Sequence, residues 1–192
     1  MSVESLKNKI LSYSHVNEED LNHFASFAKR IKIKKGDFLF KEGDHVDHFY
    51  YIDKGILLFY RLIDGVEKVI EFFLEDEFTT DLFSYEKNHP TVCSAKALED
   101  VEILLLPKED LEKLYDSSMD MQRFGRRLML DEYMKLLVRS KNKDILSNEE
   151  RYLRLMDRRH DLSQRVPQYM IASYLGLTPV GLSKIRKRLS RG

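Results

Sequence analysis

The chain has 192 residues, enough for one large domain or for a medium domain followed by a small one. With 43% hydrophobic residues it can bury an ordinary core, and with Cys93 as its single cysteine it excludes an internal disulfide, a cysteine-ligated cluster and a zinc finger. No segment approaches the roughly 20 apolar residues of a membrane span. We therefore expect a cytoplasmic protein without a membrane partner.

The formal net charge is zero, but the charges are divided unevenly along the chain. Residues 139–192 carry 13 Lys and Arg against 5 Asp and Glu, whereas residues 1–138 carry 19 against 27. A basic tail on an acidic body indicates that the tail meets a polyanion while the body does something else. The alternative is that the two oppositely charged parts simply attract each other.

Two short amphipathic helices are expected at the start of the chain. The apolar spacing predicts the first over residues 3–13 and the second over about Asn17–Ala28, with Asn17 as its N-cap. From Ile31 the apolar period changes from helical to alternating. This alternation predicts short strands separated by glycine-containing turns at Lys35–Asp37, Glu42–Asp44, Asp53–Gly55 and Asp64–Gly65.

A less regular acidic segment, Leu74–Pro90, interrupts the strands, which resume at Thr91–Ala97 and Val101–Pro107. Many short antiparallel strands with glycine turns favour a closed or double-sheet β-structure over a parallel sheet. We expect a β-roll that encloses an interior.

The helical period restarts at Lys108–Tyr115 and leads into a long helix over about Met119–Ser140. Its apolar residues cover more than one face and are Met121, Phe124, Leu128, Met129, Leu130, Tyr133, Met134, Leu136, Leu137 and Val138. A surface helix needs only one apolar stripe, so we expect one part to pack on the roll and another on a second chain, forming a homodimer. The charged stretch Arg139–Leu146 is the expected hinge.

The stretch Ser147–Glu150 has the capping-box pattern and predicts another helix, and Asp161–Arg165 is expected to be a short loop. Pro167 suits the first position of the next helix. The expected apolar side of that helix carries Tyr169, Ile171, Ala172 and Leu175. Gly176 follows where a left-handed conformation turns the chain.

Thr178 is the expected N-cap of a last helix that has Pro179 at its first position. This helix is expected to bury Leu182, Ile185 and Leu189 and to point its polar and basic residues away from them. Two short helices joined by a tight turn, the second of them basic, are typical of a helix-turn-helix that enters the DNA major groove. The alternative is an ordinary helical hairpin with a solvated basic face.

Three motifs in this arrangement resemble the Crp/Fnr family of bacterial transcription regulators. GDFLFKEGD (Gly36–Asp44) and FYYIDKG (Phe49–Gly55) resemble the first hairpins of a cyclic-nucleotide-binding-type roll. IASYLGLTPVGLSKIRKRL (Ile171–Leu189) resembles the helix-turn-helix of Crp-like regulators of the Bacteroidetes type. The resemblance spans about residues 15–189.

The resemblance implies an α+β fold in three parts. An antiparallel β-roll of the jelly-roll type with flanking helices is expected at 1–116, as an effector domain. A long dimerisation helix and hinge are expected at 117–141, and an all-α helix-turn-helix domain at 142–192.

Such a dimer reads two half-sites about 34 Å apart on double-stranded DNA. The expected DNA contacts are Gln168, Tyr169, Thr178, Val180, Gly181, Ser183, Lys184, Lys187 and Arg188. The chain departs from the family in having Val180 and Gly181 where a Glu usually accepts from cytosine, so Val180 is expected to contact a thymine methyl instead. RNA polymerase is a further candidate partner.

In cyclic-nucleotide binders of this family a Glu holds the ribose and an Arg followed by Ser or Thr holds the phosphate. Asp81 falls near that Glu, but Pro90 and Thr91 fall where Arg-Ser would be, and no Arg lies between Arg61 and Arg123. We therefore expect no cofactor and no control by cyclic AMP. A residual pocket for another effector is expected around Phe73, Asp81, Leu82, Phe83, Pro90, Thr91 and Asp131, and the alternative is that its aromatic residues are simply core.

The main hypothesis is a dimeric DNA-binding transcription regulator that is not an enzyme. A second hypothesis is a small-molecule sensor that acts through protein partners rather than DNA. A β-roll enzyme of the cupin type would need a clustered His and Glu metal set, and neither His45 with His48 nor any other spacing supplies one.

Overall fold

The computed structural model describes residues 2–190. Its helices are α1 (Ser2–Tyr13), α2 (Glu18–Phe27), α3 (Leu82–Lys87), α4 (Lys108–Ser117), α5 (Met119–Ile145), α6 (Asn148–Arg158), α7 (Leu162–Arg165), α8 (Gln168–Tyr174) and α9 (Pro179–Leu189). Its strands are β1 (Lys29–Ile33), β2 (Phe38–Phe40), β3 (His48–Lys54), β4 (Leu57–Ile63), β5 (Val66–Phe73), β6 (Phe78–Thr79), β7 (Ser94–Ala97) and β8 (Val101–Pro107).

The strands form two four-stranded sheets, β1-β8-β3-β6 and β2-β7-β4-β5, in which every pairing is antiparallel. The predicted antiparallel roll is therefore confirmed. The β4–β5 hairpin turns through Asp64 and Gly65, whose φ angles of 52° and 74° are those that this two-residue turn requires. Inward-facing side chains such as Phe40, Tyr50 and Phe59 are buried in one core cluster and fill the roll.

The irregular segment between Leu74 and Pro90 contains β6 and α3, and the strand expected from Thr91 begins at Ser94. Asp81 caps α3 by accepting hydrogen bonds from the backbone N–H groups of Phe83 and Ser84. The cap explains why a helix forms in a segment with no clear helical period.

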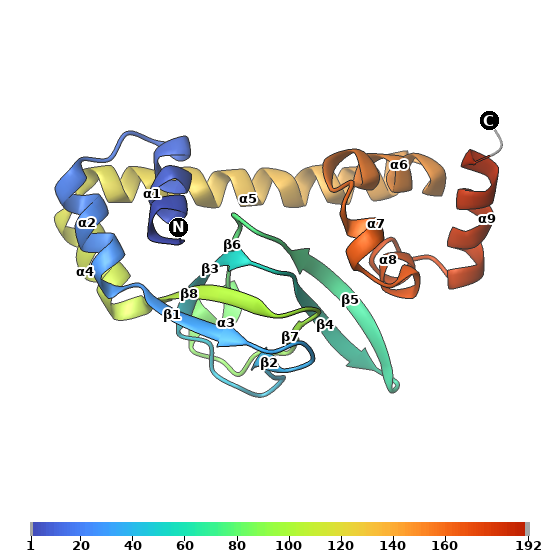
Figure 1. Cartoon of the computed structure of the whole chain (residues 1–192), viewed down its shortest axis with the longest axis horizontal. Coiled ribbons are helices and arrows are strands. Elements are labelled where there is room, and N and C mark those ends of the chain that lie inside the picture. Colours follow the sequence, from blue (N-terminus) through green and yellow to red (C-terminus); the bar gives the residue numbers. More distant parts are fainter. Residues whose placement is uncertain (1, 191–192) are drawn as a thin grey trace.

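The first four residues of strand β4 are buried on both faces of the sheet. Leu57 and Phe59 lie in the core of the roll, whereas Leu58 and Tyr60 belong to a second core cluster shared with the C-terminal helices. Because successive side chains of a strand point to opposite faces, one sheet serves two cores. Helix α8 lies beside β5 at this side of the roll (Figure 1).

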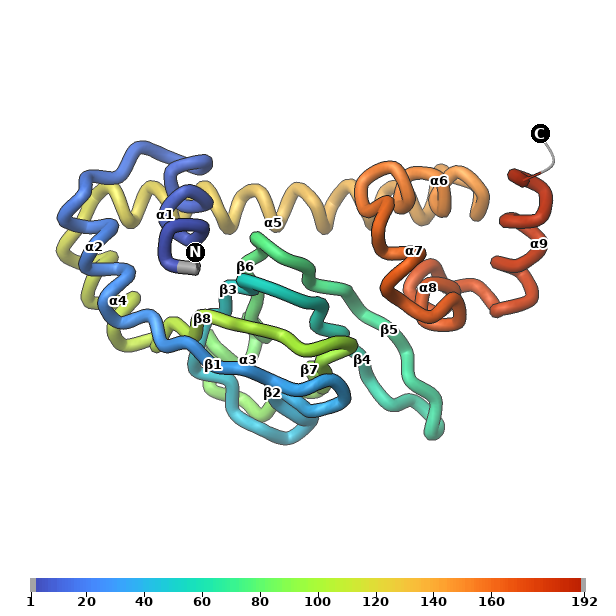
Figure 2. Tube along the Cα trace, viewed as in Figure 1, coloured from blue at the N-terminus to red at the C-terminus, as the bar shows by residue number. Residues whose placement is uncertain are grey.

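Helix α5 runs along the whole roll and links it to the C-terminal helices (Figure 2). It continues for 27 residues to Ile145, so the hinge expected at Arg139–Leu146 is helical up to its last residue, and the prediction of an end near Ser140 is wrong. Arg139, Lys141 and Lys143 are good helix formers, and nothing before Ser147 breaks or caps the helix. Across residues 2–190, none of the helices combines the length and the apolar character needed to cross a bilayer.

The C-terminal helices α6 to α9 form the head of the molecule. The capping box of Ser147 and Glu150 is present at the start of α6, as predicted. The loop expected at Asp161–Arg165 is instead the short helix α7, because Leu162 is fully buried and anchors a helical turn there. Tyr169 was expected on the apolar side of α8 but is exposed, and Met170 is buried in its place.

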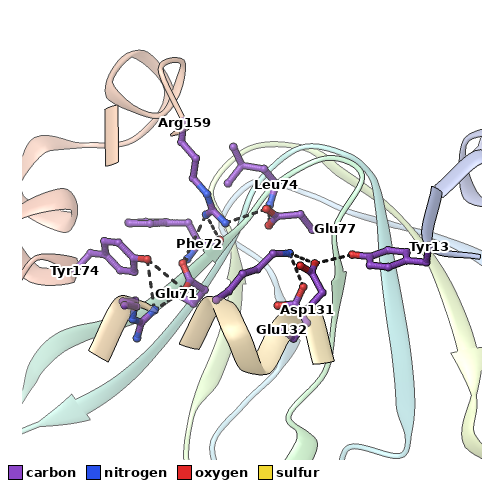
Figure 3. A network of polar contacts seen from close by, with 11 residues as sticks. Tyr13, Glu71, Phe72, Leu74, Glu77, Asp131, Glu132, Arg159 and Tyr174 are labelled. Atoms are coloured by element: carbon purple, nitrogen blue, oxygen red, sulfur yellow. Dashed lines mark hydrogen bonds and ion pairs between the residues drawn. The ribbon is translucent and has the colours of Figure 1, made fainter. Parts of the chain in front are cut away.

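Two arginines of the head reach acidic groups of the roll. Arg159 Nη2 lies 2.9 Å from Glu77 Oε1, and Figure 3 shows its side chain extended between Phe72 and Glu77. Arg165 pairs with Glu75 of the roll at 2.6 Å and with Glu99. Opposite charges of the two parts therefore do attract each other.

Candidate nucleic-acid interface

The turn between α8 and α9 has the geometry of a helix-turn-helix. Gly176 adopts the left-handed conformation with φ 69°, and the N–H of Leu177 donates to the carbonyl of Ala172 at 2.8 Å. Thr178 then caps α9, because its Oγ1 accepts from the N–H of Gly181 at 3.0 Å, and Pro179 occupies the first helical position. The predicted N-cap and first residue of α9 are confirmed.

Helix α9 presents two different faces. Leu182 and Ile185 are buried against the rest of the head. Val180, Ser183, Lys184 and Lys187 are exposed, and because they are spaced i, i+3, i+4 and i+7 they share one face. Figure 1 places α9 at the end of the molecule farthest from α1 and α2.

The other residues expected to contact DNA differ in their exposure to solvent and in their contacts within the protein. Tyr169 is 52% exposed at the start of α8. Gln168 is half-buried and donates through Nε2 to the carbonyl of Ser163 at 3.4 Å. Arg188 pairs with Glu149 of α6, so its guanidinium holds α9 to the head. Gly181 is half-buried, and a Cβ there would lie 3.2 Å from the Thr178 hydroxyl that caps the helix.

One cation that faces solvent is missing from the expected set. Arg186 is exposed in the last turn of α9. The run of basic residues from 184 to 188 was the available signal. Arg186 lies to one side of the face shared by Val180, Ser183, Lys184 and Lys187.

The residues expected around an effector pocket have separate environments. Thr91 donates to Asp81, so these two are together. Leu82, Phe83 and Pro90 are exposed, whereas Phe73 packs on Phe59. Asp131 lies on α5 and accepts from Tyr13 at 3.0 Å and pairs with Lys135 at 2.9 Å. Within residues 2–190 no cluster of three His, Cys, Asp or Glu is suited to a metal.

Comparison with known proteins places these features in context. The cyclic nucleotide-binding domain family matches residues 30–118. The transcriptional activator protein Anr of Pseudomonas protegens is 32% identical over 136 residues, which are 67% of this chain and 55% of that protein. The fumarate and nitrate reduction regulatory protein of Escherichia coli is 26% identical over 92% of this chain and 75% of its own length. The chain spans about half the length of Anr.

A solved structure shares the fold over most of the chain. FixK2 from Bradyrhizobium japonicum has a TM-score of 0.69 and 22% identity, with 85% of each chain covered. At this identity the likeness concerns the fold alone.

Proposed function

The chain belongs to the Crp/Fnr family, and from this premise we propose that it is a transcription regulator that binds a roughly palindromic DNA operator as a homodimer. The observation that carries the proposal is the exposed face of α9, where Lys184 and Lys187 lie beside Val180. Cationic side chains on an exposed helix of a helix-turn-helix suit the phosphates and base edges of a major groove. Double-stranded DNA in the cytoplasm is then the principal partner, and RNA polymerase is a second candidate.

The dimer is proposed from the free side of α5. Leu130, Tyr133 and Met134 are at least half exposed, although the same helix buries Phe124 and Leu128 against the roll. Leu130, Tyr133 and Leu137 recur at the three- and four-residue spacing of a two-stranded coiled coil. A second copy of α5 would cover this stripe and set the spacing of the two heads.

The proposed parts of the chain are the effector roll at 1–116, the dimerisation helix at 117–141 and the DNA-binding head at 142–192. The interior of the roll is filled by its own core, with Phe40, Tyr50 and Phe59 buried. This packing, with Pro90 and Thr91 in place of a phosphate-binding pair, supports a regulator that cyclic AMP does not control.

The function is tested by measuring affinity for selected genomic fragments across a salt series. Because each phosphate contact releases condensed counterions, log Kd should change with log salt with a slope of at least about 3 for a dimer with four lysine contacts. A slope near zero, or an absence of binding to any duplex, contradicts the proposal. If the chain binds protein partners and has no affinity for DNA, the result favours a small-molecule sensor that acts through those partners.

Replacing Leu130 by Asp is expected to weaken the dimer at least about tenfold, because a carboxylate would be buried in an apolar seam. Sedimentation equilibrium measures the change. Leu11→Asp, at an exposed apolar position of α1, is the matched control and should leave the dimer unchanged. Equal dimer affinity of the Leu130 variant and the wild type would remove α5 from the interface.

A further inference from the structure

A small cavity lies on the outer side of the sheet β1-β8-β3-β6, away from the interior of the roll. Alternation along β3 separates the two sides: Tyr50 and Ile52 belong to the core inside the roll, whereas Phe49 and Tyr51 face the helices. Between the outer side of this sheet and α3, α4 and α5 there is a cavity of about 120 Å³. It is thus separate from the place where a cyclic nucleotide would sit inside a roll.

The cavity is lined mainly by aromatic and aliphatic side chains, among them Phe49, Phe78, Leu106, Leu111, Phe124 and Leu128. An apolar cavity of about 150 Å³ in another protein stays dry and binds benzene, so this volume suits a single ring. Filling it would restore dispersion contacts that the lining atoms lack.

The two charged side chains that line the cavity are both acidic. Glu86 and Glu112 both contribute to its lining and are otherwise exposed. Burial, with a further effect of Glu112, raises the pKa of Tyr115 to about 12, and burial likewise raises the pKa of Tyr85, so both phenols stay neutral. Two carboxylates would repel a carboxylate or phosphate ligand at this site.

A second hollow adjoins the cavity at Tyr115. A larger hollow of about 500 Å³ on the surface of α5 is lined by residues that include Met119 and Arg126, and it shares Tyr115 and Gly125 with the inner cavity. A Cβ at Gly125 would lie only 3.1 Å from the ring of Tyr115. The absence of a side chain at Gly125 therefore lets the Tyr115 ring lie between the surface hollow and the inner cavity.

We propose that this cavity binds a small neutral aromatic molecule of one ring. The ligand would lie against Phe124 and Leu128, so its occupancy acts directly on α5, the helix that joins the roll to the head. Ligand binding requires neither DNA nor a second copy of the chain. A failed DNA experiment and a failed ligand experiment are therefore separate results.

The test uses the full chain, with toluene as the neutral probe and benzoate as its anionic counterpart. Saturating toluene is expected to raise the Tm by about 2–4 °C, because a ligand that binds only the folded state stabilises it, and benzoate should raise it by less than a third as much. In NMR spectra, toluene should change the chemical shifts of the methyl groups of Leu106 and Leu111, which line the cavity. The methyl shifts of Leu57, inside the roll, should stay the same.

Two tryptophan variants of α3 provide the control. Leu82 lines the cavity and is 48% exposed, whereas the neighbouring Phe83 is 64% exposed and does not line it. Leu82→Trp should reduce the toluene shift in Tm at least threefold, and Phe83→Trp should preserve it. No stabilisation of the wild type, equal shifts in both variants, methyl shifts centred on Leu57, or equal effects of benzoate and toluene would each overturn the proposal. The NMR result decides the matter if Leu82→Trp does not fold.

Discussion

Replacing Lys184 and Lys187 together by alanine is expected to weaken operator binding at least about a hundredfold at physiological salt, because a dimer loses four cationic contacts to DNA. The dependence of DNA affinity on salt concentration should also become weaker. Its log–log slope should decrease by about 3–4, since each phosphate contact contributes roughly 0.9. Fluorescence anisotropy across a salt series measures both quantities.

Lys29 and Lys87, on β1 and α3, are exposed lysines of the roll and provide a control of equal charge change. The double alanine variant at these positions should bind DNA within about twofold of the wild type, since distant charges are screened beyond about 10 Å. If both double variants lose the same affinity, the effect is one of overall charge and α9 is not the contact surface.

Arg165→Met is expected to lower the free energy of unfolding by about 2–3 kcal/mol, because three carboxylates lose their shared cation. Arg165 is about one-quarter exposed and pairs with Glu75, Glu99 and Asp161, so solvent screening reduces the cost below that of a fully buried pair. Urea denaturation measures the loss. Arg123→Met, which removes only an exposed pair with Asp120, should change stability by less than about 1 kcal/mol.

The stability of the protein at low pH should depend on the same ion pairs of Arg165. Burial acts to raise the pKa of Glu75, but its hydrogen bonds from Arg165 and the backbone outweigh burial and lower the pKa. The hydrogen bond from Arg165 also lowers the pKa of Asp161. A lowered pKa stabilises the fold above the unfolded-state pKa, so this contribution is lost as pH falls below about 4.5.

Glu77 acts in the opposite sense, because burial raises its pKa despite the neighbouring Arg159. Its protonation favours the fold, and its contribution declines as pH rises through the raised pKa. In Arg165→Met, the free energy of unfolding should therefore fall less steeply as the pH drops below about 4.5. The gain in stability that comes from protonating Glu77 at low pH should remain. If the free energy of unfolding of the variant falls with acid as steeply as that of the wild type, Arg165 does not set these pKa values.

Local chemistry was sufficient to predict the roll and the helix-turn-helix. The Asp64-Gly65 pair specifies a two-residue hairpin because both residues tolerate positive φ. Gly176 and Thr178 mark the turn and the cap in the same way. These signals act within a few residues and do not depend on the rest of the fold.

The features that could not be predicted depend on contacts between distant parts. The charged stretch from Arg139 resembles a linker, yet Arg139 pairs with Glu71 of the roll and the helix continues. The order of residues in the chain does not show that Asp131 accepts a hydrogen bond from Tyr13, 118 positions away. Both outcomes were decided by tertiary partners.

One signal for the docked head was present in the sequence. The run Ile56–Tyr60 is apolar at five consecutive positions, which is typical of a strand buried on both faces rather than of a half-exposed strand. Alternation alone would have placed polar side chains at two of these positions. The run therefore indicated that something covers the outer face of the sheet.

Because β4 contributes to both hydrophobic cores, the roll and the head should melt as one cooperative unit in calorimetry, with a single heat-absorption peak. A fragment beginning at α6 would lose the apolar wall formed by Leu58, Tyr60 and Phe72. Amide protons of β4 and of α8 should then exchange with solvent through the same global opening.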